Sequence, residues 1–352
     1  MFAARTVASV ARICTAFVAA IVIASSSALG DPDSVRAQPP FGSADAWFRL
    51  GAQLSAPALP YLRALGSTSP SISYGSDGRL TILLLGSDTR SGGIGRTDTI
   101  MIMSLKGSQI SAASIPRDSA RIPKPGGGYY KGRVNTLARQ MGLPAFADLI
   151  GRVLQIQIDY YALVSFGGFD RLVDVVDPIT LNNPRTIKDG RFWDDPTKKS
   201  GVYFPALSSY TLNAWPNGPL CNGLYRNYTN PPLSTACHRA LPYVRTRKAD
   251  SDFARARRQQ TFVSAVIRKV TGGSYLSALV SAATGQAVAG TLRTSIPINL
   301  TTASEFYNAL NGASVTHQVV FQPKTYAAHI PGTTAYQLKL SAVRAWTAAY
   351  MR

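Results

Sequence analysis

Two apolar runs frame a polar, glycine-containing stretch near residue 90. "LTILLLG" at 80–86 and "TIMIMSL" at 99–105 are almost continuously aliphatic, which is typical of short strands buried on both faces. "KGS" at 106–108 predicts a turn into a third strand, "QISAASI" at 109–115. A turn this short makes the last two strands antiparallel, and the loop joining the first two is too short for a helical crossover. The pattern therefore predicts a three-stranded meander.

Such a meander brings the end of the first strand, the start of the second and the end of the third to one edge of the sheet. The charged residues at these three points are Asp88, Arg90, Arg96, Asp98, Arg117 and Asp118. The glycines of "SGGIG" between them let the backbone approach a small ligand closely. We therefore expect a charged site at this edge.

Apolar periodicity beyond residue 140 alternates between helical and extended segments. Residues 185–237 are rich in loop-forming residues. A long helix follows, with Asp252 as its expected N-terminal cap and Arg255, Arg258 and Gln259 sharing a face at offsets of three and four. The other expected elements are a helix at 142–156, a strand at 159–166, a helix at 167–176, a strand at 179–184 and a short helix starting near 240. This alternation predicts an α/β domain.

Composition adds a strong basic bias. The 352 residues contain 37 Lys and Arg against 18 Asp and Glu, and 27 of the 37 basic residues are Arg. Arginine forms planar two-point contacts with phosphates and carboxylates, so anionic partners are favoured. Charge alone leaves nucleic acid, anionic lipid, anionic glycan and a merely solvated basic surface open.

The N-terminus indicates export. Arg5 and Arg12 precede an apolar, uncharged run up to Gly30, which is typical of a cleaved secretory signal or a short signal-anchor, and both remain open. Residues 31–78 are rich in Pro, Ser, Ala and Gly and are interpreted as an extracytoplasmic stem, with one catalytic domain at 79–352. Export places the protein in the cell envelope, membrane-anchored or secreted, and argues against a nucleic-acid partner.

Cysteine usage fits export. Cys221 and Cys237 are the two cysteines of the mature chain, and in an oxidising compartment we expect them to form a disulfide worth roughly 3 kcal/mol. A metal site there is a poor alternative, because His238 is the only nearby histidine and no CxxC is present.

Several enzyme classes lack their motifs. The chain has only three histidines, none in a nucleophile motif, which argues against Ser-His-Asp hydrolysis. It contains no Walker loop, no GxGxxG and no HExxH. An aspartate at a strand end is by itself more often a turn or cap residue, and a charge cluster is usually a solvated face. The combination of carboxylates, several arginines and export is what favours a phosphate-handling site.

Six segments carry a resemblance to a known family: "LLLGSDTR", "GRTDTIMIMSL", "SIPRDS", "KGRVNTL", "DYYALVSFGGFDRLVD" and "YVRTRKADSDFARARRQQ". In this order, over about residues 80–272, they resemble the LytR-CpsA-Psr enzymes of bacterial cell envelopes. The resemblance implies an α-β-α sandwich with a central mixed, largely antiparallel sheet, flanking helices and an apolar groove for a lipid tail. It also implies transfer of a glycan phosphate from a polyprenyl-pyrophosphate carrier to a hydroxyl of peptidoglycan or another wall glycan, with Mg²⁺ or, in its place, Mn²⁺.

The same resemblance assigns roles to individual residues. Asp88 and Asp98 correspond to metal-binding carboxylates, and one of them is the expected base. The implied catalytic set is Asp88, Asp98, Arg96, Arg117, Arg245 and Arg247. The implied substrate-binding set is Arg90, Lys131, Arg255, Arg258 and Gln259. Asp118 and Asp252 are expected to hold arginines in place, and Arg258 is ambiguous between substrate binding and such a structural role.

Two other functions use the same features. One is an exported phosphatase that hydrolyses polyprenyl pyrophosphates with water as the acceptor. The other is a non-enzymatic envelope protein that binds wall polymer or regulates envelope genes.

Overall fold

The computed structural model describes residues 72–89, 93–166, 168–169, 173, 178–190, 202–212, 240–247, 249–271, 292–297, 305–306 and 308–352. The predicted signal or anchor at 1–30, the stem up to residue 71, Arg90, and Cys221 with Cys237 lie outside these residues, as does most of the predicted helix at 167–176. None of the helices in the described ranges combines the length and the apolarity that a membrane crossing requires.

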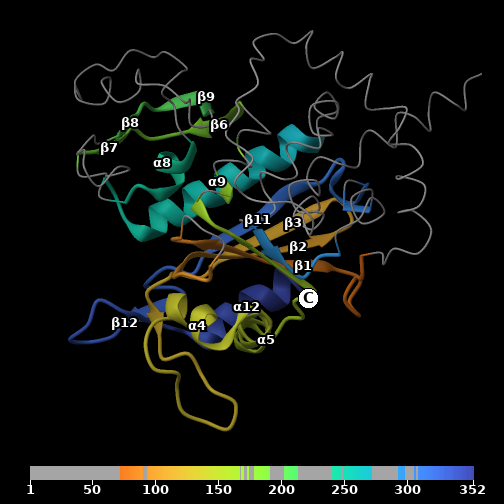
Figure 1. Ribbon diagram of the computed structural model, residues 1–352, viewed down its shortest axis with the longest axis vertical. Helices are drawn as coiled ribbons and strands as arrows, with labels where there is room; N and C mark the ends of the chain where they lie inside the picture. The colour runs from red at the N-terminus through yellow and green to blue at the C-terminus, as the bar shows by residue number, and fades with distance from the viewer. Residues whose placement is uncertain are drawn as a thin grey trace, which may run out of the picture.

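A six-stranded mixed sheet forms the centre of the molecule (Figure 1). Its strand order is β10-β5-β1-β2-β3-β11. The strands are β1 (Leu80–Ser87), β2 (Thr97–Lys106), β3 (Gln109–Ser114), β5 (Tyr160–Val164), β10 (Leu292–Thr294) and β11 (Ser314–Val320). The pairs β1–β2, β2–β3 and β5–β10 are antiparallel, whereas β1–β5 and β3–β11 are parallel. The predicted meander is confirmed, and so is the mixed, largely antiparallel sheet.

Both faces of this sheet are buried, because side chains of one strand alternate between two cores. Leu83 and Leu85 of β1 face one core, and Leu80 of the same strand faces the other. In β2, Ile102 and Met103 divide in the same way. This two-sided burial explains why the strands read as nearly continuous apolar runs.

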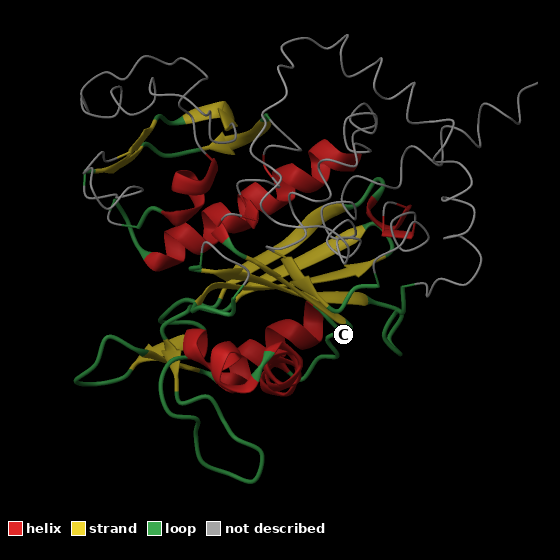
Figure 2. Cartoon of the chain, viewed as in Figure 1, coloured by secondary structure: helices red, strands yellow, loops and turns green. Residues whose placement is uncertain are grey.

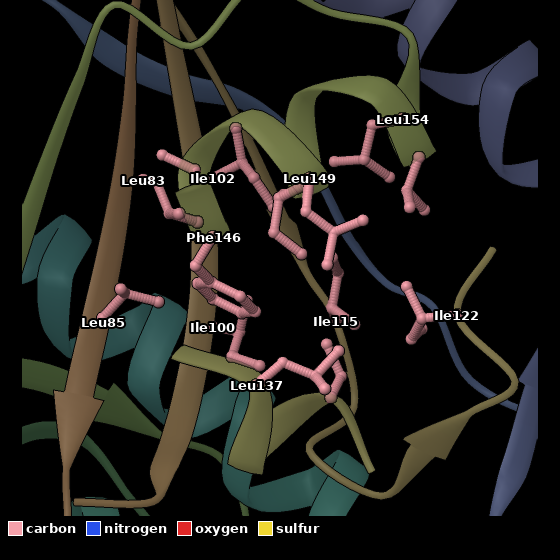
Figure 3. Packing of buried hydrophobic residues seen from close by; sticks show 14 of the residues in the cluster. Leu83, Leu85, Ile100, Ile102, Ile115, Ile122, Leu137, Phe146, Leu149 and Leu154 are labelled. Carbon is pink, nitrogen blue, oxygen red and sulfur yellow. The ribbon is translucent and has the colours of Figure 1, made fainter. Parts of the chain in front are cut away.

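Three helices cover one face: α4 (Val134–Met141), α5 (Leu143–Leu154) and α12 (Leu340–Tyr350). Phe146 and Leu149 of α5 and Leu137 of α4 pack against Leu83 and Ile102 of the sheet (Figure 3). A small sheet, in the order β12-β13-β4, lies beside these helices (Figure 2). Its strands are β4 (Ser119–Ala120), β12 (Ala327–His329) and β13 (Tyr336–Leu338).

The opposite face carries α9 (Asp252–Thr271), preceded by α8 (Ala240–Arg245) (Figure 2). Beyond these helices lie two two-stranded sheets, β6–β9 and β7–β8. Their strands are β6 (Ile179–Asn183), β7 (Ile187–Asp189), β8 (Val202–Phe204) and β9 (Leu207–Leu212). The interpretation of 185–237 as loop-rich was therefore incomplete. Phe204 and Tyr210 from this region are buried in a core with α8 and α9, and this packing orders strands too short to be recognised from their own sequence.

Candidate functional site

The hairpin of β1 and β2 places Asp88 beside Arg96. Ser87 pairs with Thr97, and the amide of Asp88 donates to the carbonyl of Arg96 over 3.1 Å. In return the Arg96 amide donates to Asp88 Oδ1 over 2.8 Å. Both side chains are exposed, so the Asp88 carboxylate is held at the rim by the backbone.

Gly95 permits this geometry. A Cβ at position 95 would lie 2.3 Å from Asp88 Oδ1 and 2.9 Å from Ser87 Oγ. Ser87 Oγ also accepts a hydrogen bond from the Gly95 amide over 3.0 Å. The close approach in this stretch is that of Gly95 to the Asp88 carboxylate, whereas the predicted approach of the backbone to a small ligand stays a prediction.

Gly95→Ala is expected to displace the Asp88 carboxylate, because the added methyl group would lie 2.3 Å from its Oδ1. We expect the phosphotransfer that the family resemblance implies to fall by about tenfold or more. Gly93→Ala is the matched control, since a Cβ there meets nothing within 4 Å. Turnover of a lipid-pyrophosphate donor by the two variants, together with their thermal midpoints, checks the expectation. Equal activity of the two variants would contradict it.

A cluster of alternating charges lies at the same edge of the sheet. Arg117 Nη1 donates to Asp98 Oδ2 over 2.5 Å, and Arg117 Nε lies 3.5 Å from Asp252 and 3.8 Å from Asp118. Arg255 contributes Nη1, 3.3 Å from Asp252, and Nη2, which donates to the Asp98 carbonyl over 3.4 Å. Strand β2, the β3–β4 connection and the first turns of α9 thus meet at one point.

Two members of this cluster were missed by sequence reasoning. Arg133 Nη1 pairs with Asp118 Oδ1 at 2.5 Å, and Asn135 Nδ2 donates to Asp98 Oδ1 over 3.3 Å. Both follow Lys131 in "KGRVNTL", a segment that was noted only for its lysine. We call the whole set the edge cluster: Asp98, Arg117, Asp118, Arg133, Asn135, Asp252 and Arg255.

Asp252 is not the helix cap that its position predicted. Ser251 has this role, since its Oγ accepts from the Ala254 amide over 3.2 Å and its carbonyl accepts from the Arg255 amide. Asp252 is the first residue of α9 and turns its carboxylate to Arg117 and Arg255. Because a serine precedes it, the aspartate is available to orient the arginines.

Burial acts differently on the two central arginines. It would lower the pKa of Arg117, but Asp98, Asp252 and Asp118 together outweigh burial, and this pKa lies above its ordinary value. For Arg255 the effect of burial is larger than the attraction of Asp252, and the nearby positive charge of Arg117 acts in the same direction as burial. The pKa of Arg255 is therefore lowered. An anion that reached Arg255 would relieve this penalty.

The edge cluster leaves hydrogen-bonding capacity unused. In the described ranges six buried side-chain nitrogen and oxygen atoms lack a hydrogen-bond partner. Four of them belong to the cluster: the donors Arg117 Nε and Arg255 Nε, and the acceptors Asn135 Oδ1 and Asp252 Oδ1. Arg117 Nε and Asp252 Oδ1 still have ion-pair contacts of 3.5 and 3.3 Å within the cluster. Since buried polar groups are normally hydrogen-bonded, the remaining capacity at this edge favours a polar ligand there.

A second group of predicted residues lies where α8 leads into α9. Arg245 lies over the Phe166 ring, 4.0 Å from its centroid, and Arg247 is exposed. Arg258 is buried and donates to the Tyr243 and Thr246 carbonyls while pairing with Asp250. Gln259 donates to the Val244 carbonyl over 3.1 Å. This geometry favours a supporting role for Arg258, the residue whose role the sequence left ambiguous.

Asp189 is a further residue that no motif indicated. It is 2% exposed, and its Oδ2 accepts a 2.5 Å hydrogen bond from the hydroxyl of Thr246, which is itself fully buried. Thr246 separates Arg245 from Arg247, so this bond fixes the backbone between the two arginines. Lys131 lies exposed in the loop before α4.

The donor set fits a hard divalent cation. Asp88 and Asp98 offer carboxylate oxygens, and the unpaired Asn135 Oδ1 lies on the amide that contacts Asp98. Mg²⁺ prefers such oxygens and usually takes only one or two protein carboxylates, with water and phosphate completing its shell. The described part of the chain gathers no three His, Cys, Asp or Glu side chains into a metal-binding group.

Comparison with known proteins agrees with the resemblance. Residues 61–348 match the LytR_cpsA_psr family. The chain belongs to this family. Over 106 residues it is 34% identical to the regulatory protein MsrR of Staphylococcus aureus (strain COL), covering 29% of this chain and 31% of the relative. Over 203 residues it is 27% identical to the polyisoprenyl-teichoic acid–peptidoglycan teichoic acid transferase TagU of Bacillus mycoides (strain KBAB4), covering 56% and 55%. The matches thus span about a third to a half of these curated relatives.

Solved structures share the LytR_cpsA_psr fold. TagV of B. subtilis superposes with a TM-score of 0.56 at 19% identity, covering 79% of this chain and 98% of that one. Protein gbs0355 of Streptococcus agalactiae gives 0.58 at 20% identity, covering 80% and 90%. TagT bound to LIIa-WTA gives 0.54 at 21% identity, covering 81% and 96%. At these identities the likeness establishes the α/β architecture.

Proposed function

We propose that the protein is an extracytoplasmic phosphotransferase that moves a glycan phosphate from a polyprenyl-pyrophosphate carrier to a hydroxyl of peptidoglycan or another wall glycan. The observation that carries this proposal is the edge cluster, in which two buried arginine donors and two buried oxygen acceptors make no hydrogen bond. Two of these atoms, Arg117 Nε and Asp252 Oδ1, have only ion-pair contacts of 3.5 and 3.3 Å within the cluster. A phosphate with a bound cation supplies both kinds of partner. The name of one relative, the transferase TagU, supports the same reaction class.

Charge balance assigns different tasks to the arginines. Within the edge cluster three arginines face three aspartates, so the cluster holds its guanidinium groups in place without a net positive field. Arg96, Arg245 and Arg247 lie nearer to solvent and provide the excess charge that attracts a pyrophosphate. Arg117 and Arg255, which belong to the edge cluster, would then bind the pyrophosphate from its buried side.

The reaction balances with the groups present. The acceptor hydroxyl oxygen forms a bond to the glycan-linked phosphorus, and the bond from that phosphorus to the bridging oxygen breaks, releasing polyprenyl phosphate. The hydroxyl proton passes to Asp88 or Asp98. Negative charge that develops on the bridging oxygen is stabilised by the preorganised arginines. Mg²⁺ held by Asp88 and Asp98 would supply further neutralisation of phosphate charge.

The same proposal places the protein in the cell envelope. The apolar segment before residue 31 would hold it at the outer face of the membrane or direct its secretion, and residues 31–78 would act as a stem for the domain at 79–352. The polyprenyl donor provides a second link to the membrane.

The decisive experiment incubates the exported domain with a radiolabelled lipid-pyrophosphate-linked glycan, peptidoglycan and Mg²⁺. We expect label in covalently modified peptidoglycan, its loss with EDTA and its return with Mg²⁺ or Mn²⁺. Label only in freed glycan phosphate would instead support the pyrophosphatase. Donor binding without any turnover would instead support a polymer-binding or regulatory protein. Transfer by metal-free protein would contradict the assignment of a metal to Asp88 and Asp98.

A further inference from the structure

A cavity lies outside the edge cluster, between the loop that follows β4 and the end of β13. Its volume is about 480 Å³, within the range of about 300–1,000 Å³ usual for small-ligand sites. Its rim carries Arg121, Lys124 and Tyr129, and the apolar side chains are those of Ile122, Leu338 and Leu340 with Pro123. The rim therefore offers two cations and one aromatic ring around a short apolar floor.

The loop that forms this rim is built by the backbone. The Tyr130 amide donates to the Ile122 carbonyl over 2.9 Å, and the Lys124 amide donates to the Gly128 carbonyl over 3.1 Å. Gly126, Gly127 and Gly128 close the turn with φ of 81°, 107° and 72°. A Cβ at any of these glycines would meet nothing within 4 Å, so the backbone conformation is what requires glycine there.

Two side chains on the rim are placed for a ligand. Tyr129 is 52% exposed, one of three large hydrophobic side chains in the described ranges with so much surface in solvent. Arg121 has φ of 52°, a conformation that is costly for a residue other than glycine and that is found more often at binding sites. Its Nη1 donates to Gln337 Oε1 over 3.3 Å, and Lys124 Nζ lies 5.5 Å from the Tyr130 ring centroid.

Strands β4 and β13 connect the residues that line the cavity to the edge cluster. Strand β4 begins directly after Asp118 and pairs with β13, and the Tyr336 amide donates to the Asp118 carbonyl over 3.1 Å. Arg133, paired with Asp118, also donates from Nη2 to Thr334 Oγ1 over 2.6 Å. Asp118 and Arg121 are three residues apart, a backbone span of at most roughly 10 Å. One extended polymer could therefore contact both places.

The chemistry of the rim suits an anionic sugar. The exposed tyrosine ring offers an apolar face for a pyranose ring, while Arg121 and Lys124 can bind a carboxylate or phosphate. A cavity of this volume and so short an apolar floor does not suit a long polyprenyl chain.

We propose that this cavity is a subsite for an anionic sugar residue of the acceptor glycan, a proposal that rests on the transferase function above. The glycan strand would bind at Arg121, Lys124 and Tyr129 and extend along β4 and β13, which presents its hydroxyl group to the edge cluster. The same chemistry could come from the glycan of the donor, and the experiment separates the two sources.

The test measures binding by calorimetry to three probes: a peptidoglycan oligosaccharide with free lactyl carboxylates, a neutral chitin oligosaccharide of equal length, and a non-hydrolysable lipid-pyrophosphate donor analogue. We expect Tyr129→Ala and Lys124→Ala each to weaken binding of the acidic oligosaccharide by about tenfold, with the donor analogue unaffected. Tyr74→Ala, at 49% exposure, and Lys106→Ala, at the far end of β2, are the matched controls and should bind like the original protein.

Unchanged binding of the acidic oligosaccharide in both rim variants would overturn the subsite. Weaker binding of the donor analogue alone would also overturn it, because the cavity would then bind the glycan of the donor. Equal binding of the acidic and the chitin oligosaccharides would overturn it as well, because Arg121 and Lys124 would then have no part in recognition. Failure of the transferase proposal is visible separately, as loss of label transfer in the original protein despite normal oligosaccharide binding.

Discussion

Replacing Asp98 with asparagine is expected to lower transfer by about 100-fold or more while the domain remains folded. Asp98 is the carboxylate that Arg117 contacts at 2.5 Å, and it lies beside Asn135. Asparagine keeps the shape but removes the charge that would neutralise Mg²⁺ and orient Arg117. Because Arg117 keeps Asp252 and Asp118 nearby, the free energy of unfolding should fall by only about 1–3 kcal/mol.

Asp148→Asn is the matched control for this change. It also removes one carboxylate, but its side chain is 75% exposed in α5 and pairs with Arg152 of the same helix. Transfer rate and thermal midpoint measured for both variants separate a local catalytic effect from a general effect of charge. Activity of Asp98→Asn close to that of Asp148→Asn would show that Asp98 forms a structural ion pair and nothing more.

A metal titration gives a second readout. If Asp98 is a ligand, Asp98→Asn should require about tenfold or more Mg²⁺ for half of its residual activity, since one of two protein carboxylates is lost. If Asp98 only orients Arg117, activity falls while the Mg²⁺ requirement stays unchanged. The two roles therefore differ in an observable that does not depend on the size of the activity loss.

Turn lengths were enough to predict the charged edge. The two-residue turn between Lys106 and Gln109 forces β2 and β3 antiparallel, and the β1–β2 loop cannot hold a crossover. Asp98 and Arg117 therefore had to lie near each other. The burial of both faces of the central sheet was predicted separately, from the nearly continuous apolar runs of its strands. The glycines near residue 90 were read as room for a ligand, and the structure shows that Gly95 makes room for the Asp88 carboxylate.

Contacts between residues far apart in sequence were not predictable in this way. Asp189 and Thr246 are 57 positions apart, and their hydrogen bond depends on the packing of β7 against the α8–α9 turn. Strand β11 completes the sheet beside β3 from about two hundred residues away, and its exposed-intermediate alternation gives no sign of its partner. The cavity near Tyr129 likewise exists only because β13 returns to β4.

Arg247 and Arg258, two of the arginines where α8 leads into α9, are expected to respond differently to replacement by alanine. Arg247→Ala should reduce transfer by about 10- to 100-fold with a thermal midpoint within a few degrees of the original, because Arg247 is exposed and would lose a charge-assisted phosphate contact. Arg258→Ala should instead lower the free energy of unfolding by about 3–5 kcal/mol, since it leaves Asp250 and the Tyr243 and Thr246 carbonyls without their donor.

Arg257→Ala is the control for the loss of one positive charge, because Arg257 is exposed on the same helix and donates to Gln322 Oε1 over 3.0 Å, away from the α8–α9 turn. Transfer kinetics, donor affinity and thermal unfolding of the three variants form one comparison. Arg257→Ala should transfer normally, and Arg247→Ala should bind the pyrophosphate donor more weakly at unchanged stability. Should Arg247→Ala unfold, or should it keep full donor affinity, Arg247 does not contact the pyrophosphate, and attraction of the donor would rest on Arg96 and Arg245.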